Sequence, residues 1–323
     1  MPATNVPRRG TGSPEPRRGR FSGMTASGFP THWRLRTRSL ELPAPGRRVR
    51  RPLVMGIVNV TPDSFSDGGR YSGVEAAVAH GLALAAEGAD LLDVGGESTR
   101  PYAAAVTEAE ELRRVTDVVR RLACESGVPV SIDTSKAAVA ERAVDLGAEI
   151  INDVTGLEGD PRMMAVARES GAGVCAMHMQ GTPQTMQVDP RYGDVVAEIH
   201  AYLAARRDAI LAAGIPVDRV CLDPGIGFGK THEHNMVLLQ HAGRFLDLGT
   251  PILVGHSRKG FLAKSLERSL GRPVTEADRD AATAGAACRL AAQGIQIVRV
   301  HAVGLVRSAL ELFAVTHVGG DGQ

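Results

Sequence analysis

The chain has 323 residues and a formal net charge of +1. None of its apolar stretches reaches the ~18 residues of a membrane helix, so we expect no membrane partner. The length fits one α/β barrel of about 250 residues behind an N-terminal extension, or two smaller domains.

Charge is distributed unevenly along the sequence. Residues 1–51 hold twelve Arg and two acidic residues, a net charge of +10, so the remaining chain carries −9. An acidic body is a poor partner for nucleic acid, and such binding would depend on the basic tail alone. We therefore expect small-molecule substrates and no nucleic acid.

The first thirty residues are rich in Pro, Gly, Ser and Arg, which predicts a disordered extension over residues 1–30. They lack the continuous apolar segment of a secretory signal, and prolines interrupt the helix that a mitochondrial presequence would need. Met24 is an alternative start. Residues 33–42 then alternate apolar and polar, as a half-exposed strand does. We expect this strand, alone or as a hairpin, to pair with the chain leading into Leu53 and to close a barrel floor.

From Leu53 onward, eight short apolar runs alternate with helix-length segments. Their length and β-branched content are typical of buried parallel strands, and their order predicts a (β/α)₈ TIM barrel, a single α/β domain over residues 31–318. The runs end at Asn59, Glu97 to Arg100, Asp133, Asn152 and Asp153, His178, Asp223, His256 to Lys259, and Arg299 with His301. Because all barrel strands end on one face, we expect one site there.

Helix boundaries are also visible. Thr107 and Thr275, each followed three positions later by an acid, resemble capping boxes that begin helices. Six glycines stand where a left-handed C-cap is wanted: Gly88, Gly127, Gly147, Gly171, Gly214 and Gly294. Residues 260–280 form a long connection in which we expect an additional helix.

The four cysteines lie far apart without a CxxC pair. Cys175 and Cys221 fall inside apolar runs, where a buried, reduced thiol is the ordinary state. This cysteine usage indicates the cytoplasm.

Two turns have unusual sequences. Residues 59–69 are too long and polar for a structural βα loop, which favours a mobile active-site loop in which Phe65 covers a ligand. Residues 223–230 read DPGIGFGK. Pro224 occupies the position of the first P-loop glycine, and the G-x-G-x-G spacing is not the dinucleotide fingerprint. We expect these glycines to let the backbone approach a flat ligand, with Phe228 available for stacking.

Basic side chains gather at the last two strands. Arg299 and His301 are two positions apart and share one side of a strand, and Lys259 lies at an expected helix N-terminus. Barrel phosphate sites often use these strands. A surface salt bridge fits poorly because the run before Arg299 is apolar, so a phosphate site is favoured.

Asp133, Asn152 and Asp223 end three further strands. Such groups are costly to bury unless hydrogen-bonded, and two acids with an amide suit a heterocycle rich in N–H donors. A metal site is the alternative, although these residues lack compact ligand spacing. We interpret His178, which is flanked by methionines, as a packed lining residue.

Together these segments resemble the dihydropteroate synthase family over about residues 33–316. The segments are MGIVNVTPDSFSDGG, DVGGESTRP, IDTSK, IINDVTG, LDPGIGFGK, GHSRKGFL and RVH, in the family's order. The resemblance implies a transferase of folate biosynthesis that condenses (7,8-dihydropterin-6-yl)methyl diphosphate with 4-aminobenzoate, giving 7,8-dihydropteroate and diphosphate. It also implies a homodimer.

Residue roles follow from the resemblance. The pterin ring is assigned to Asp133, Asn152, Asp223 and Lys259. The diphosphate is assigned to Asn59, Arg100, Arg299 and His301, with Asn59 acting also through Mg²⁺. The aminobenzoate pocket is assigned to Phe65, Thr99, Pro101, Phe228 and Lys259, and Asp67 to the closing loop. The implied catalytic residues are Asp133, Lys259, Arg299, His301 and Asp67.

Three positions depart from the family pattern. Ala302 stands where Asp is usual, Tyr102 where Gly is frequent, and Gly260 where Ser is frequent. Two alternatives remain. A pterin barrel that moves a methyl group to a corrinoid needs no diphosphate ligands, so Arg100 and Arg299 count against it. A non-catalytic paralogue that binds pterin or phosphate is left open by Ala302 and Tyr102.

Overall fold

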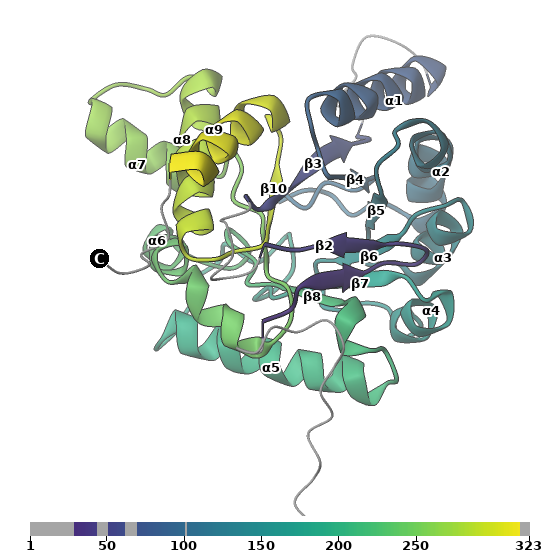
Figure 1. The fold of residues 1–323 in the computed structure, drawn as a ribbon. Coiled ribbons are helices and arrows are strands. Elements are labelled where there is room, and N and C mark those ends of the chain that lie inside the picture. The colour runs from purple at the N-terminus through teal and green to yellow at the C-terminus, as the bar shows by residue number, and fades with distance from the viewer. Residues whose placement is uncertain (1–28, 44–50, 62–69, 101, 317–323) are drawn as a thin grey trace, which may run out of the picture.

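The computed structural model describes residues 29–43, 51–61, 70–100 and 102–316. The central sheet has eight parallel strands (Figure 1). They are β3 (Leu53–Asn59), β4 (Leu91–Gly95), β5 (Val130–Asp133), β6 (Ile150–Asp153), β7 (Gly173–Met177), β8 (Val220–Asp223), β9 (Leu253–Val254) and β10 (Ile297–Val300). Each predicted apolar run is therefore a strand.

The sheet closes into a barrel. Its strands follow the order β8-β7-β6-β5-β4-β3-β10-β9. The two outer strands meet at a parallel bridge between Leu222 and Ile252, where the N–H of Leu222 donates to the carbonyl of Pro251 at 2.9 Å. The predicted (β/α)₈ TIM barrel is confirmed.

Helices surround the barrel (Figure 1). They are α1 (Arg70–Ala86), α2 (Glu108–Glu125), α3 (Ala137–Asp145), α4 (Met163–Ser170), α5 (Val195–Ala212), α6 (His232–Gln240), α7 (Gly260–Leu270), α8 (Glu276–Ala292) and α9 (Val303–Thr316), with short 3₁₀ helices η2 (Val217–Arg219) and η3 (Ala242–Leu248). The additional helix predicted in residues 260–280 is α7. No helix in the part of the chain that the structure describes is both long and apolar enough to span a bilayer.

The predicted helix boundaries are confirmed. Thr107 accepts a hydrogen bond from the N–H of Glu110 at the start of α2, and Thr275 forms a complete capping box with Asp278 at the start of α8. All six glycines expected at C-caps have φ between +65° and +107°. Left-handed backbone of this kind costs glycine little, which is why these turns could be predicted from sequence.

The core has two parts. One lies between the strands and the helices, and the other fills the lower barrel with inward side chains from most of the strands. Trp33, Leu35 and Leu42 are at most 3% exposed and pack into this second part. The N-terminal segment therefore closes the barrel floor, as predicted. The inward cysteines, Cys175 and Cys221, are buried and free, as expected.

The N-terminal segment forms a hairpin of β1 (His32–Arg34) and β2 (Ser39–Glu41), whose strands pair with each other. Pairing was predicted with the chain leading into Leu53, of which residues 44–50 lie outside the described residues and residues 51 and 52 belong to no strand. The N–H of Leu53 donates instead to the carbonyl of Gln296 at 2.8 Å. The turn depends on Glu149, whose carboxylate accepts the N–H of Thr37 at 2.7 Å. The alternation of apolar and polar residues over 33–42 gives no indication of this contact with a residue far away in the sequence.

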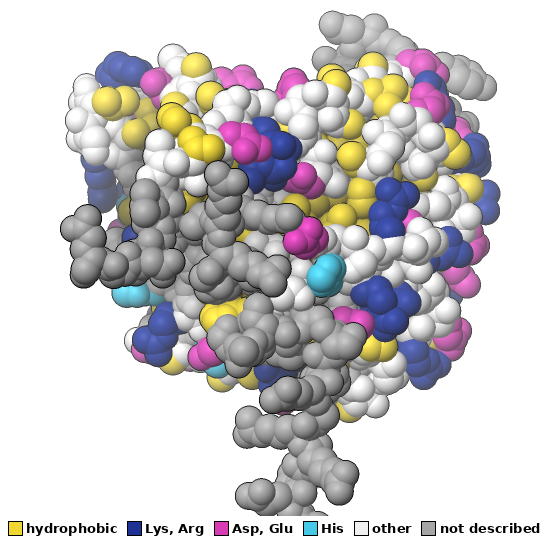
Figure 2. Space-filling model, in the orientation of Figure 1, with side chains coloured by type: hydrophobic (Ala, Val, Ile, Leu, Met, Phe, Trp, Pro, Cys, Tyr) yellow, Lys and Arg dark blue, Asp and Glu magenta, His cyan; other side chains and the backbone are white. Residues whose placement is uncertain are grey.

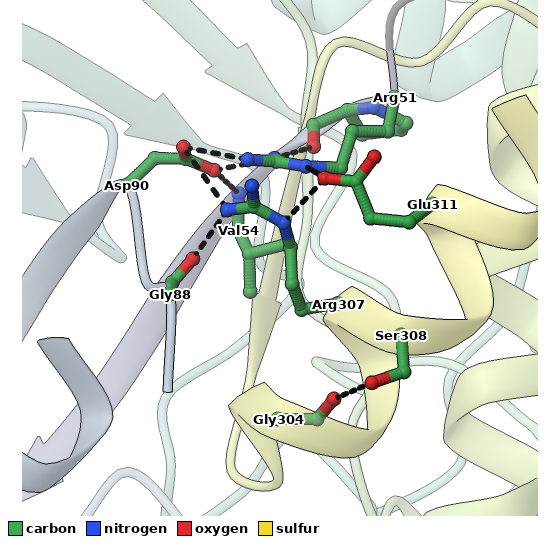
Figure 3. Close-up of polar contacts among 9 residues, drawn as sticks. Arg51, Val54, Gly88, Asp90, Gly304, Arg307, Ser308 and Glu311 are labelled. Carbon is green, nitrogen blue, oxygen red and sulfur yellow. Dashed lines mark hydrogen bonds and ion pairs between the residues drawn. The ribbon is translucent and has the colours of Figure 1, made fainter. Parts of the chain in front are cut away.

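An ion-pair network fastens the last helix to the first strands (Figure 3). Arg51 donates two hydrogen bonds to Asp90 at 2.6 and 2.9 Å and one to Glu311 of α9 at 2.9 Å. Arg307 also donates to Glu311, at 2.7 Å, and to the carbonyl of Gly88 at 2.8 Å. The network joins the two ends of the barrel domain and leaves its carboxyl face free for chemistry.

Candidate active site

Polar side chains predicted from the strand ends gather inside the carboxyl end of the barrel. Asp133 pairs in register with Gly95 on one side and with Asn152 on the other. Side chains alternate along a strand, so Asn152, Asp223 and Arg299 share the inward direction of the apolar floor residues two positions earlier, which are Ile150, Cys221 and Ile297. The lower layers are apolar and the upper layer carries the charge.

Arg299 joins two carboxylates at the centre of this layer. Its Nε donates to Asp93 Oδ2 at 2.6 Å and its Nη2 to Asp133 Oδ2 at 2.7 Å. Asn152 Nδ2 donates to the same Asp93 oxygen at 3.0 Å. Asp93 Oδ1 is buried without a partner among the described residues. The cluster therefore offers a buried acceptor and leaves several guanidinium N–H groups unused.

The low polarity of the cavity shifts the acid–base properties of this layer. Burial raises the pKa of Asp133 above its ordinary value, although Arg299 opposes the shift. Burial also raises the pKa of Asp223, although the hydrogen bond that it accepts from the N–H of Gly225 at 2.7 Å opposes the shift. For Arg299 the carboxylates of Asp93 and Asp133 outweigh burial and raise its pKa, so it stays charged.

Lys259 and Phe228 form the adjoining wall. Lys259 Nζ donates to the carbonyl of Ile226 and lies 4.4 Å from the centroid of the Phe228 ring, a cation–π contact. Burial lowers the pKa of Lys259 to about 7, with Asp223 opposing. The lysine is therefore a cation whose charge is easily lost as the pH rises.

The glycines of residues 223–230 let this turn pack closely against other parts of the protein. A Cβ at Gly225 would lie 1.9 Å from the carbonyl oxygen of His178, and one at Gly229 would lie 2.3 Å from that of Gln180. A Cβ at Gly227 would lie 2.7 Å from Lys259 Cδ. The glycines thus bring the turn against the β7–α5 connection and against Lys259, and the approach of this backbone to a flat ligand stays a prediction.

Lys230, at the end of that turn, is 2% exposed. Its Nζ contacts His178 Nδ1 at 3.0 Å and donates to the carbonyls of Phe228 at 2.8 Å and His178 at 3.4 Å. His178 is buried, as predicted, and burial lowers its pKa to about 3, so the neutral ring accepts from the lysine. Lys230 thereby fixes the turn that carries Phe228.

The connection between β7 and α5 links two other rim loops. The N–H of Tyr102 donates to the carbonyl of Pro183, and Gln184 Nε2 to the carbonyl of Ala103, each at 3.1 Å. At its other end, Gln187 Nε2 donates to the carbonyl of Gly227 at 3.1 Å. The connection spans the gap between the loop that follows Arg100 and the turn that carries Phe228.

His301 is held by Ser257. The Ser257 hydroxyl accepts the N–H of His301 at 3.1 Å and lies 3.0 Å from its Nδ1. Burial and the nearby Arg299 lower the pKa of His301 to about 3, so the ring acts as a neutral hydrogen-bond donor. Ser257 therefore fixes the orientation of the His301 ring.

The remaining predicted residues lie on the rim or outside the described residues. Asn59 ends β3 beside Gly95 of β4, Thr99 is half-buried, and Arg100 is exposed. Thr99 and Arg100 follow Glu97, which accepts the N–H of Val106 at 2.9 Å and so anchors the loop base. The predictions for Phe65, Asp67 and Pro101 fall outside the residues that the structure describes.

Two residues escaped sequence analysis. Asp93 is fully buried inside β4, and the signal that could have revealed it was an acid in the middle of an apolar run. Lys230 was considered only as part of a failed P-loop pattern. No local signal shows that its ammonium group is buried, because its partner His178 comes from another strand end.

Comparison with known proteins agrees with this geometry. The family model described as "Pterin binding enzyme" matches residues 55–301. A closed barrel whose carboxyl end holds buried acids, an amide and cations therefore places the chain in the class of pterin-binding TIM-barrel enzymes.

The family within this class is shown by individual relatives. Dihydropteroate synthase from Neisseria meningitidis serogroup B is 45% identical over 268 residues, which cover 81% of this chain and 92% of the relative. The structure of the Xanthomonas albilineans dihydropteroate synthase with 4-aminobenzoic acid has a TM-score of 0.79 at 45% identity, covering 89% of this chain and 99% of that one. The same enzyme in complex with 7,8-dihydropteroate gives 0.72 at 41% identity, covering 83% and 94%. The chain belongs to the dihydropteroate synthase family, and it is a transferase of folate biosynthesis.

Proposed function

We propose that the carboxyl face of this barrel condenses (7,8-dihydropterin-6-yl)methyl diphosphate with 4-aminobenzoate and releases diphosphate. The observation that carries the residue assignment is the buried Asp93–Arg299–Asp133 cluster. It offers acceptor oxygens to the ring N–H groups of a pterin and guanidinium N–H groups to its acceptors. Asn152 and Asp223 extend the same surface.

The chemistry fits a dissociative displacement. Loss of diphosphate from a CH₂ group on an electron-rich pterin leaves a resonance-stabilised cation, which the buried carboxylates of Asp93 and Asp133 stabilise electrostatically. Arg100 and the neutral His301 donate hydrogen bonds to the departing diphosphate. The amine of 4-aminobenzoate is already nucleophilic, so the site needs no strong base.

The second substrate lies between Lys259 and the rim. Phe228 packs against the aromatic ring, and Lys259, 4.4 Å from the Phe228 centroid, attracts the carboxylate. The rim loop that holds Thr99 completes the pocket. Hydrogen bonds from the β7–α5 connection link these two walls.

Mg²⁺ fits as a cofactor held mainly by substrate. No group of three or more His, Cys, Asp or Glu suited to a metal occurs in the described part of the chain. Mg²⁺ commonly uses one or two protein oxygens together with phosphate oxygens and water. The Asn59 amide oxygen, at the carboxyl end of β3, would be such a ligand. The ion would neutralise charge on the diphosphate leaving group.

We further propose that the enzyme is a cytoplasmic homodimer. Four free cysteines are in keeping with a reducing compartment. Leu305, Leu312 and Val315 are 47–77% exposed on α9, and such apolar side chains on one helix suit a subunit interface. Light scattering of the full chain tests the dimer, and a monomeric mass at micromolar concentration would refute it.

Release of diphosphate, measured by a coupled assay with both substrates, tests the reaction. We expect turnover with Mg²⁺ and none without 4-aminobenzoate. Asn59→Ala is expected to weaken the dependence on Mg²⁺, and an unchanged Mg²⁺ titration would reject the role of Asn59. Methyl transfer from methyltetrahydrofolate to a corrinoid, with no diphosphate release, would support the other pterin-barrel chemistry.

A further inference from the structure

A hollow of about 230 Å³ opens at the floor of the barrel, which we call the floor hollow. It is lined by Arg34 of β1, Arg168 of α4 and Arg219 of η2, with apolar walls that include Ile215 and Pro216. These residues adjoin the amino ends of the strands, whereas the candidate active site lies at the carboxyl ends. Figure 2 shows the floor side of the molecule, where Lys and Arg side chains lie around the hairpin.

Carboxylates neutralise only part of the charge in the floor hollow. Arg34 Nη2 donates to Asp218 at 3.1 Å, and Arg168 Nη2 donates to Glu169 at 2.6 Å. Arg219 Nη1 donates to the backbone carbonyl of Leu35 at 3.2 Å, and no ion pair joins Arg219 to any described carboxylate. Arg219 therefore forms no direct ion pair with a described carboxylate, although the negative charges of Asp218 and Glu149 act on it.

Two further features indicate a missing acceptor. Arg34 Nε is buried and has no hydrogen-bond partner among the residues described. Burial and the neighbouring Arg34 lower the pKa of Arg219, although the carboxylates of Asp218 and Glu149 oppose the shift. An anion between Arg34 and Arg219 would offset the mutual repulsion of the two guanidinium groups.

We propose that the floor hollow binds a phosphate-type oxyanion between Arg34 and Arg219. The planar guanidinium fork matches the oxygens of a phosphate. The volume is several times the roughly 30 Å³ that one water molecule occupies in the liquid, so a tetrahedral anion fits. The anion is either free phosphate or the phosphoryl group of a larger molecule.

The chain contains its own reporter for this site. Trp33 is the single tryptophan of the sequence and is fully buried. Its Nε1 donates to the backbone carbonyl of Arg219 at 3.0 Å. Tryptophan fluorescence therefore responds to the floor hollow, while ligands of the candidate active site bind at the opposite end of the barrel.

The test titrates inorganic phosphate into the full-length protein while KCl keeps the ionic strength constant, and it follows Trp33 emission. We expect a saturable change that weakens at least tenfold in Arg219→Gln, which keeps the backbone carbonyl bound to Trp33. Arg168→Gln, which leaves the hairpin contacts intact, is expected to weaken it as well. Arg289→Gln, an exposed arginine of α8 far from the floor hollow, is the matched control and should behave as wild type.

Parallel titrations with AMP and with adenosine distinguish the two sources of the oxyanion. Tighter binding of AMP than of phosphate assigns the site to the phosphoryl group of a larger molecule, and equal or weaker binding assigns it to free phosphate. A thermal melt checks that Arg219→Gln is folded. If that variant is unfolded, the phosphate titration of Arg168→Gln tests the proposal in its place. No saturable change in wild type, or undiminished binding in the folded variants, overturns the proposal.

Discussion

The ammonium group of Lys230 lies 3.0 Å from Nδ1 of His178, in a space where both side chains are buried. Lys230 also donates to the carbonyl of Phe228 at 2.8 Å. Burial lowers the pKa of both groups, and the negative charge of Asp223 opposes this shift for Lys230. Burying a cation here is costly, so the contact is best understood as the means of fixing the turn that presents Phe228.

Replacing this lysine tests that role. Lys230→Met keeps most of the volume but leaves the Phe228 carbonyl without its donor. We expect at least a tenfold rise in KM for 4-aminobenzoate with little change in pterin affinity. Stability should fall by about 1–3 kcal/mol, the usual effect of an unpaired buried polar group. Lys264→Met, at an exposed lysine of α7, is the control. Equal KM values in the two variants would contradict a positioning role for Lys230.

The bridging arginine should tolerate no substitution. In the wild type, the Arg299 guanidinium donates to Asp93 at 2.6 Å and to Asp133 at 2.7 Å. In Arg299→Lys a single ammonium group replaces this planar guanidinium. We expect kcat/KM to fall by roughly 10²–10³, as when a preorganised donor is removed. Asp93→Asn should cause a loss of similar size, because it removes the negative charge next to the pterin. Activity near the wild-type value in either variant would exclude the cluster from the reaction.

The pH dependence should show the buried lysine. Burial lowers the pKa of Lys259 to about 7, so its positive charge is present below that pH and is lost above it. Because the proposed partner is the carboxylate of 4-aminobenzoate, kcat/KM for this substrate should decline as the pH rises through about 7. Lys259→Arg, which remains charged, should have lower activity but no such decline. A decline that persists unchanged in the arginine variant would assign it to another group.

Gly260 offers a gain-of-function test. It begins α7, and nothing lies within 4 Å of a Cβ built at this position. Gly260→Ser would add a hydroxyl at the helix N-terminus beside Lys259, where anions are stabilised. We expect a lower KM for 4-aminobenzoate and a small gain in stability. An unchanged or higher KM would show that the aminobenzoate carboxylate does not reach α7.

Much of the fold could be predicted because its signals are local. Parallel strands buried on both faces are continuous apolar runs, and left-handed C-caps require glycine. The sequence could not decide between the two predicted alternatives, a single N-terminal strand or a hairpin, because the turn over residues 35–38 contains no Gly, Pro, Asn or Asp and is held by Glu149. A strand pattern without a turn signal is naturally read as one strand.

The site was predictable to a similar degree. Residues at strand ends, such as Asp133 and Arg299, share one face of the barrel by topology alone. The exact partners are set by tertiary packing: Arg299 lies between two acids, and one of them, Asp93, is two residues short of the end of β4. The turn glycines were assigned to a ligand because sequence shows the close approach without showing what is approached.

The last prediction concerns the order of binding. Arg100 is exposed at the rim, and its loop is tied down through Glu97 to the N–H of Val106 at 2.9 Å and to Lys136. The loop base is thus fixed, while the arginine has no side-chain partner among the described residues. Diphosphate would give the Arg100 guanidinium a partner and draw the rim loop over the pocket. We therefore expect 4-aminobenzoate to bind weakly to the free enzyme and more tightly once pterin, diphosphate and Mg²⁺ are present.

We expect a coupling of about 1–3 kcal/mol between diphosphate and 4-aminobenzoate, or roughly 5–150-fold in affinity. Calorimetric titrations of 4-aminobenzoate, with and without pterin, diphosphate and Mg²⁺, measure it directly. Arg100→Ala should remove most of the coupling and leave pterin affinity nearly intact, because the pterin cluster is built from other strands. Arg113→Ala, an exposed arginine on α2, serves as the control. Equal aminobenzoate affinity with and without diphosphate in the wild type would rule out this ordering.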